Sequence, residues 1–140
     1  MHRLLLLVPL LLLGACAGPL PPPDASKAWV DMHSWSPGDM LMAERLDGKR
    51  WPDGRYFQVP PGAHELEVRY RFEIYAGGGT GFRDPTRLTC FIRYRFDNFQ
   101  AGARYRIEAR EAAMRPQSWL YDADRNIVAD GEVLNCGPYG

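Results

Sequence analysis

The sequence lacks an excess of charge of either sign. Its 140 residues carry 17 Lys and Arg against 17 Asp and Glu, so the formal net charge is zero. Proteins that bind nucleic acids usually show a basic excess or a basic stripe along one element. The charge balance gives no such indication, and we expect no nucleic-acid partner.

Residues suited to reactive sites are also scarce. Only three cysteines and three histidines are present, with no Cys-x-x-Cys pair and no histidine at ligand spacing from a cysteine. A Gly-x-Ser-x-Gly nucleophile motif is missing. Most carboxylates stand in Asp-Gly turns or alternate with arginines, so no acid–base pair stands out. We therefore expect no metal, no cofactor and no enzymatic activity.

No apolar run is long enough to span a membrane, although one short run stands at the start. The basic residues of Met1-His2-Arg3 precede residues 4–13, which are apolar apart from an interruption at Pro9. A membrane-spanning helix needs about 20 apolar residues, whereas a short run after a basic start is typical of a secretory signal. We expect a signal peptide over residues 1–15.

The expected signal ends in Leu13-Gly14-Ala15-Cys16, which resembles the lipobox of bacterial lipoproteins. The resemblance implies that lipid such as palmitate is attached at Cys16, which becomes the mature N-terminus. Each buried CH₂ of such chains contributes about 0.8 kcal/mol to membrane binding. Inner-membrane lipoproteins usually carry Asp after this cysteine, and Ala17 follows here, so the resemblance implies the periplasmic face of the outer membrane. The alternative is ordinary cleavage within Ala15-Cys16-Ala17, which leaves Cys16 unmodified.

The residues after Cys16 are rich in proline. The stretch Pro19-Leu20-Pro21-Pro22-Pro23-Asp24 cannot form a helix or a strand ladder and favours an extended polyproline II conformation. We interpret residues 16–27 as a linker that separates the lipid from one domain, residues 28–140. A proline-rich ligand for another protein is the alternative.

From residue 28 onward, apolar residues alternate with polar ones instead of recurring at helical spacing. Leu66, Val68 and Tyr70, for example, alternate with glutamates and arginines. Turn sequences such as Asp-Gly separate the alternating runs. The pattern predicts an all-β, antiparallel β-sandwich of about 7–8 strands. We place strands near 28–33, 39–46, 55–59, 64–75, 86–96, 103–111, 117–122 and 126–130, and a helical turn is conceivable only at 111–114.

Two segments of this domain resemble the PEGA-type module of bacterial surface proteins. The first is Glu44-Arg45-Leu46-Asp47-Gly48-Lys49, and the second is Val59-Pro60-Pro61-Gly62-Ala63-His64-Glu65-Leu66-Glu67-Val68. In that family a strand ends in an Asp-Gly turn, and a Pro-Gly-x-His turn opens the next strand. The resemblance covers about residues 40–75 and implies a small, generally non-catalytic β-sandwich attached to envelope proteins. We expect Gly62 to adopt a positive φ and His64 to hydrogen-bond the turn backbone.

Cys90 and Cys136 are the cysteines that remain if Cys16 is acylated. An even pair in an exported chain indicates a disulfide, which would contribute about 4 kcal/mol through loop closure. Cys90 shares its strand parity with the apolar residues Ile92 and Tyr94. We therefore expect the bond to hold the tail, residues 133–140, over the buried face of the sheet.

Two loops imitate ligand-binding motifs. Residues 77–81 form the glycine-rich stretch Gly-Gly-Gly-Thr-Gly, but they lack the Gly-Lys-Ser/Thr end of a phosphate loop, and we expect a flexible hairpin loop. Asp122-x-Asp124-x-Asn126 resembles the start of a calcium loop, yet Ile127 stands where glycine is needed. We expect an Asp-rich hairpin turn there.

Arginine supplies 15 of the 17 basic residues, and its planar fork suits phosphate and carboxylate groups. We expect strands 86–96 and 103–111 to be neighbours, and the outward arginines to share one face. Pairing of each arginine with a glutamate favours an interaction or assembly module with an envelope protein partner. Arginines without such pairs favour the alternative, a lipoprotein that binds an anionic glycan or lipopolysaccharide. The four tryptophans could add stacking surfaces, although some should lie in the core. The candidate ligand face comprises Arg69, Arg71, Arg93, Arg95, Arg104 and Arg106.

Overall fold

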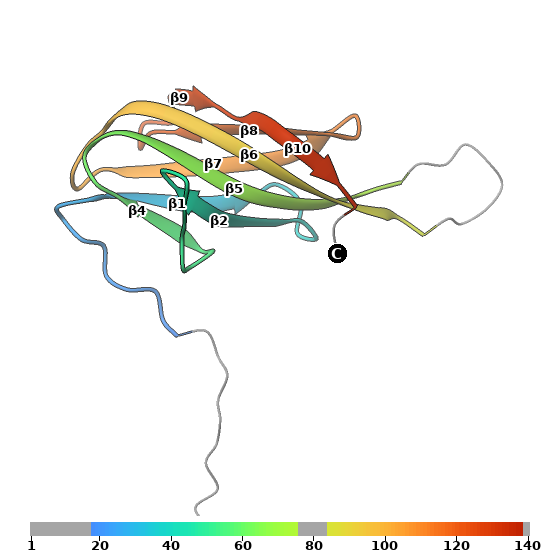
Figure 1. The fold of residues 1–140 in the computed structure, drawn as a ribbon, viewed down its shortest axis with the longest axis horizontal. Coiled ribbons are helices and arrows are strands. Elements are labelled where there is room, and N and C mark those ends of the chain that lie inside the picture. The colour runs from blue at the N-terminus through green and yellow to red at the C-terminus, as the bar shows by residue number, and fades with distance from the viewer. Residues whose placement is uncertain (1–17, 76–83, 139–140) are drawn as a thin grey trace, which may run out of the picture.

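The computed structural model describes residues 18–75 and 84–138 (Figure 1). The expected signal peptide, Cys16 and the glycine-rich residues 77–81 lie outside the described residues. The described part is a β-sandwich of two five-stranded sheets, as the alternating pattern predicts. In Figure 1 the long strands β5 and β6 run side by side, while β1 starts at one end of the sandwich and β10 ends at the other.

The chain passes back and forth between the two sheets, leaving one to three consecutive strands in a sheet each time. The first sheet has the order β4-β1-β7-β8-β9, with β4 (Tyr56–Val59), β1 (Ala28–Ser34), β7 (Arg104–Ala112), β8 (Arg115–Tyr121) and β9 (Ile127–Asp130). The second has the order β10-β6-β5-β2-β3, with β10 (Glu132–Gly137), β6 (Thr86–Phe99), β5 (Gly62–Ile74), β2 (Met40–Leu46) and β3 (Lys49–Arg50).

All eight strands predicted from the sequence are present, with ends that differ by at most about three residues. The short strand β3 and the edge strand β10 were not expected. The pairing is antiparallel except between β1 and β7, which run parallel, with Val30 opposite Tyr105. The expectation of a wholly antiparallel sandwich is therefore wrong at this one pair, because alternation of side chains is the same in both kinds of sheet.

The inward side chains of both sheets form one apolar core. Its largest fully buried members are Tyr70, Tyr94, Phe57, Phe72 and Phe99. A series of hydrogen bonds crosses this core and joins the two sheets. The Tyr94 hydroxyl of β6 donates to Ser118 Oγ of β8, and Ser118 Oγ donates to the carbonyl of Glu108 in β7 at 2.7 Å. Because these buried hydroxyls are all satisfied, they fix the register of one sheet against the other.

The disulfide between Cys90 and Cys136 is present, with their Cα atoms 4.1 Å apart. The expected position of the tail is wrong. Residues 132–137 form the edge strand β10, which pairs antiparallel with β6 and places Cys136 directly opposite Cys90. The bond joins neighbouring strands of one sheet, because a strand beside β6 satisfies its own backbone groups, which a tail laid over apolar side chains cannot do.

Two tight turns differ from each other in how well their residues suit them. Between β2 and β3, Asp47 and Gly48 both have positive φ, at 50° and 78°. Between β7 and β8, Ala113 and Met114 also have positive φ, at 52° and 63°. A helical turn at 111–114 is therefore wrong, because β7 runs through Ala112 and a two-residue turn leads directly into β8. Side chains such as these rarely adopt positive φ, so this turn is strained.

The PEGA-like segment has the two local features expected of it. Gly62 has φ of 106°, and the strand register shifts between Gly62 and His64. A His64 ring nitrogen lies 3.4 Å from the Pro61 carbonyl oxygen, and the other lies 2.6 Å from Asp47 Oδ2. Asp47 Oδ1 accepts a hydrogen bond from the Glu65 backbone at 2.9 Å. The Asp-Gly turn and the Pro-Gly-x-His turn are therefore held against each other.

The proline-rich residues ahead of β1 contact the sandwich at two points. The Asp24 backbone donates to Gln58 Oε1 at 3.0 Å, and Arg55 donates to the Gly18 carbonyl at 2.7 Å. In residues 18–75 and 84–138, the structure has no helix that is long and apolar enough to cross a membrane.

Candidate functional site

The six arginines of the candidate ligand face do not lie on one face. Arg69, Arg71, Arg93 and Arg95 belong to β5 and β6 of the second sheet, and Arg104 and Arg106 belong to β7 of the first. The expected adjacency of strands 86–96 and 103–111 is wrong, because the turn after β6 carries the chain from one sheet to the other. The two sets therefore point outward on opposite sides of the sandwich.

The outer face of the second sheet is a network of ion pairs between strands. Arg93 lies 2.9 Å from Glu132 and 3.9 Å from Glu65, and Arg95 lies 3.0 Å from Glu65. Arg69 lies 3.7 Å from Glu44. Arg71 differs, because its Nε is buried without a hydrogen-bond partner and no described carboxylate lies within 4.0 Å of it.

The outer face of the first sheet combines arginines with aromatic side chains. Alternation brings one outward residue of each neighbouring strand into register, such as Trp29 beside Arg104 and Glu108 beside Trp119. All four contacts between a guanidinium and an aromatic ring among the described residues lie here. We name this surface the arginine–aromatic face. It comprises Trp29, Asp31, Trp35, Tyr56, Arg104, Arg106, Glu108, Arg110, Trp119, Tyr121 and Arg125.

At the centre of this face, Arg110 lies between two tryptophans. Its guanidinium carbon is 5.2 Å from the ring centre of Trp35 and 5.2 Å from that of Trp119. Its Nε donates to Gln117 at 3.0 Å, and no described carboxylate lies within 4.0 Å of it. Trp35 is 55% exposed, yet its backbone N–H donates to the Ala109 carbonyl at 3.0 Å. An exposed tryptophan is thus held in one place.

Glu108 is the buried acid beneath this arrangement, with 2% of its surface exposed. Its Oε2 accepts a hydrogen bond from the Trp35 indole at 3.2 Å, and its Oε1 accepts one from Arg125 at 3.1 Å. Arg106 Nη1 lies 3.6 Å from the same Oε1. Burial alone would raise the pKa of Glu108, but the bond from Arg125, with Trp35 and Arg106, holds that pKa below its ordinary value.

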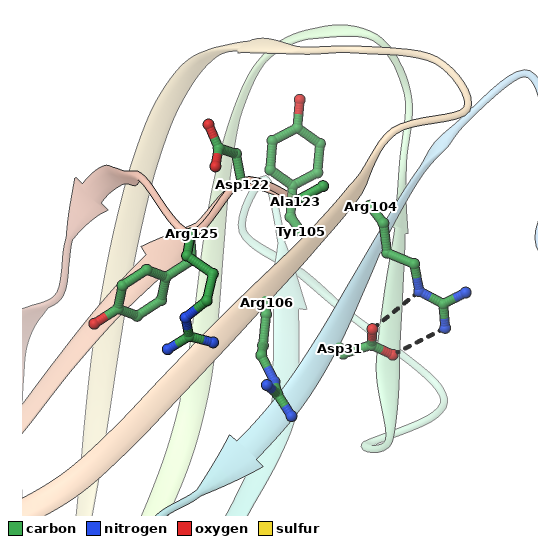
Figure 2. A pocket seen from close by; sticks show the side chains of 8 residues that line it. Asp31, Arg104, Tyr105, Arg106, Asp122, Ala123 and Arg125 are labelled. Atoms are coloured by element: carbon green, nitrogen blue, oxygen red, sulfur yellow. Dashed lines mark hydrogen bonds and ion pairs between the residues drawn. The ribbon is translucent and has the colours of Figure 1, made fainter.

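A hollow of about 400 Å³ opens at one end of the face. It is lined by arginines and acids from three elements: β1, β7 and the turn after β8. Figure 2 shows the guanidinium groups of Arg106 and Arg125 on the same side of the hollow, with the Asp122 carboxylate pointing the other way. The lining residues are Asp31, Arg104, Tyr105, Arg106, Tyr121, Asp122, Ala123 and Arg125.

The two acids that line the hollow, Asp31 and Asp122, are half-buried and already have partners. Asp31 accepts hydrogen bonds from Arg104 at 3.0 and 3.3 Å and from the Trp29 indole at 2.8 Å. Burial opposes ionisation of Asp31, but these bonds keep its pKa below the ordinary value. Asp122 accepts three N–H bonds, two from Asn126 and one from Asp124, and the bonds from Asn126 chiefly lower its pKa. These three residues form the expected Asp-rich hairpin turn.

Five of the six predicted arginines have a carboxylate within 4.0 Å, since Arg104 meets Asp31 and Arg106 approaches Glu108. Sequence reasoning did not propose Arg125, because it stands in a turn where strand alternation carries no information. The parallel pairing of β1 with β7 is what brings Trp35 to Arg110, and the sequence pattern gave no sign of it.

Among the described residues, no group of three His, Cys, Asp or Glu side chains is arranged to hold a metal ion. Comparisons with protein-family models, with curated proteins and with solved structures found no match to this chain.

Proposed function

We propose that this protein is a non-enzymatic lipoprotein of the bacterial outer membrane, anchored through Cys16 on the periplasmic side. Its domain acts as an interaction or assembly module for an envelope protein partner. The lipobox-like sequence before Cys16 supports the anchor, and the proline-rich residues 18–27 support a linker to the domain.

The observation that carries the interaction role is the stack of Trp35, Arg110 and Trp119. Tryptophan and arginine are the residues most enriched where protein interfaces bind tightly. Trp35 is exposed, but its indole is hydrogen-bonded to Glu108 and its ring packs on Arg110. Little side-chain entropy would be lost on binding, because these groups are already ordered in the free protein.

Pairing of the candidate arginines also supports a protein-contact role. On the second sheet the ion pairs link β2, β5, β6 and β10, so the arginines there pair with acids of neighbouring strands instead of facing a ligand. The contact between the Asp47 turn and His64 supports the further proposal that the domain is a PEGA-type module.

The test is photocrosslinking in living cells with a photoreactive amino acid at position 33. His33 is exposed and stands opposite Glu108, so the stack stays intact. Position 95 on the second sheet serves as the matched control. We expect a discrete adduct from position 33, none from position 95, and loss of the adduct when Arg110→Ala is added. Equal adducts from both positions would contradict the proposal.

The anchor has its own test. Cys16→Ser should abolish labelling with an alkyne fatty acid and release the protein from the membrane fraction. Equal labelling of wild type and variant would contradict lipidation at Cys16.

A second candidate function is recognition of an anionic glycan or lipopolysaccharide. The hollow favours it, since the side chains of Arg104, Arg106 and Arg125 all line it. Of the six arginines predicted to bind an anionic ligand, only Arg104 and Arg106 line this hollow. The other four lie on the opposite side of the sandwich.

A further inference from the structure

On the side of the hollow next to Glu108, positively charged groups outnumber carboxylates. Arg106 and Arg125 both approach Glu108 Oε1, at 3.6 and 3.1 Å, so two cations share one carboxylate. The other oxygen of Glu108 is occupied by the Trp35 indole. Arg104 is neutralised separately by its two bonds to Asp31. On this side of the hollow, two guanidinium groups therefore face one carboxylate, while the Asp122 carboxylate points the other way (Figure 2).

The guanidinium of Arg106 is available to a ligand. It makes no hydrogen bond to the described residues, and its side chain is 43% exposed. Arg125 uses Nη1 for Glu108 and rests on the Tyr121 ring at 5.2 Å, so its remaining N–H groups are oriented in advance. Two such forks side by side suit a carboxylate, which accepts paired N–H bonds in one plane.

The acids of the hollow limit the ligand's charge and supply acceptors. A carboxylate accepts about four hydrogen bonds, and Asp31 and Asp122 each accept three from protein groups. Each therefore keeps room for one donor, such as a hydroxyl. Because both acids stay ionised at neutral pH, a ligand with a second negative charge would be repelled.

We infer that this hollow binds a sugar acid, with its single carboxylate on Arg106 and Arg125 and its hydroxyls donating to Asp31 and Asp122. The volume of about 400 Å³ lies within the range of roughly 300–1,000 Å³ usual for small-molecule sites. The inference rests on the second candidate function and names its ligand class. The site would receive a free sugar acid or the terminal residue of an acidic glycan.

The test measures binding of defined probes to the full chain in detergent by saturation-transfer NMR. Glucuronate should bind, and glucose should bind at least about tenfold more weakly, because it lacks the charge-assisted bonds. Glucose 6-phosphate, which carries about −1.5 to −2 charges at pH 7, should also bind more weakly. Arg106→Gln should weaken glucuronate binding about tenfold or more. Arg95→Gln, an exposed and ion-paired arginine on the other sheet, should change it less than twofold.

Equal binding of glucuronate and glucose, or tighter binding of glucose 6-phosphate, would overturn the inference. So would an unchanged affinity in Arg106→Gln or an equal loss in Arg95→Gln. N-acetylglutamate amide tests for a peptide carboxylate, and binding as tight as that of glucuronate would overturn the sugar assignment. Crosslinking from position 33 is a separate measurement. If the hollow does not bind glucuronate, the proposal of a protein partner is unaffected.

Discussion

The outer faces of the two sheets use arginine side chains in different ways. On the second sheet, Arg93 and Arg95 pair with glutamates of neighbouring strands, and every short contact joins strand to strand. On the first sheet, Arg104, Arg110 and Arg125 lie over aromatic rings. Exposed ion pairs contribute little binding energy, whereas aromatic and arginine side chains held in place do. We therefore assign recognition to the first face, whereas the arginines of the second face are paired with acids of their own sheet.

The two sheets also differ in the residues of their tight turns. The second sheet has Asp47-Gly48 in its tight turn, a pair that readily adopts positive φ. The first sheet has Ala113-Met114 in the equivalent position, at a cost in backbone strain. The second sheet is also closed by the disulfide between β6 and β10.

Removing the disulfide should have the largest effect on stability and should leave the arginine–aromatic face unaffected. The double change Cys90→Ala with Cys136→Ala should lower the free energy of unfolding by about 4 kcal/mol, because the unfolded chain regains the entropy of an open loop. Denaturant unfolding measures the loss. Crosslinking from position 33 below the new melting temperature should persist, and its disappearance would show that the two sheets are not separable in function.

Glu108→Gln should destabilise the protein by about 2 kcal/mol, because a buried acid that accepts bonds from Trp35 and Arg125 is lost. Glu65→Gln, at a more exposed acid on the second sheet, should cost at most about 1 kcal/mol. Thermal melts of both variants measure the difference, and equal losses would contradict the contrast between the faces.

The loss in Glu108→Gln should depend on pH. Since the folded-state pKa of Glu108 is lowered, its stabilisation is fully present above its ordinary pKa of 4.5 and disappears as pH falls through the lower folded value. The difference in melting temperature between wild type and variant should be constant from pH 8 to 6 and shrink below about pH 4.5. A difference that grows on acidification would show that the carboxylate is not stabilised by its arginines.

Gly62→Val should destabilise the second sheet by more than about 1 kcal/mol. Gly62 has φ of 106°, which a β-branched residue adopts only with strain, although a Cβ there would contact nothing within 4 Å. The cost is therefore in the backbone alone. An unchanged melting temperature would mean that the turn, and with it the PEGA-type resemblance, has been misinterpreted.

The smallest effect has the opposite sign. Met114→Gly should stabilise the protein by about 0.5 kcal/mol, because glycine accepts the φ of 63° that strains methionine. Gly48→Ala in the second sheet should destabilise by a similar amount, since the φ there is 78°. Paired thermal melts measure both changes, and destabilisation by Met114→Gly would show that its side chain has a packing role.

The sequence predicted much of this fold because burial alternates along most strands. In β5, buried Leu66, Val68, Tyr70 and Phe72 fall on one parity, which is a direct signal of a half-buried strand. In β10, five of six residues are exposed, so no alternation marks it as a strand. Its existence follows from the backbone pairing to β6, which the side-chain pattern does not encode.

The candidate site was predicted less well, for a related reason. Parity places Arg93 and Arg104 outward, but it does not say which sheet each strand joins. The long-range pairing of β1 with β7 decides which side chains meet, and Trp35 reaches Arg110 only through it. Arg125 lies in a turn with φ of 64°, where its backbone N–H donates to the Asp122 carbonyl at 3.1 Å and fixes its position.

The most direct test of the central claim is oxidative footprinting of the full chain, compared between native envelopes and purified protein. We expect Trp35 to be modified several-fold less in the envelope, and Arg110→Ala to remove that protection. Phe91 of β6, which is half-buried and shares the outward parity of Arg93 on the second sheet, should be modified equally in both settings. Equal modification of Trp35 in both settings, or protection of Phe91 instead, would contradict the assignment of recognition to the first sheet.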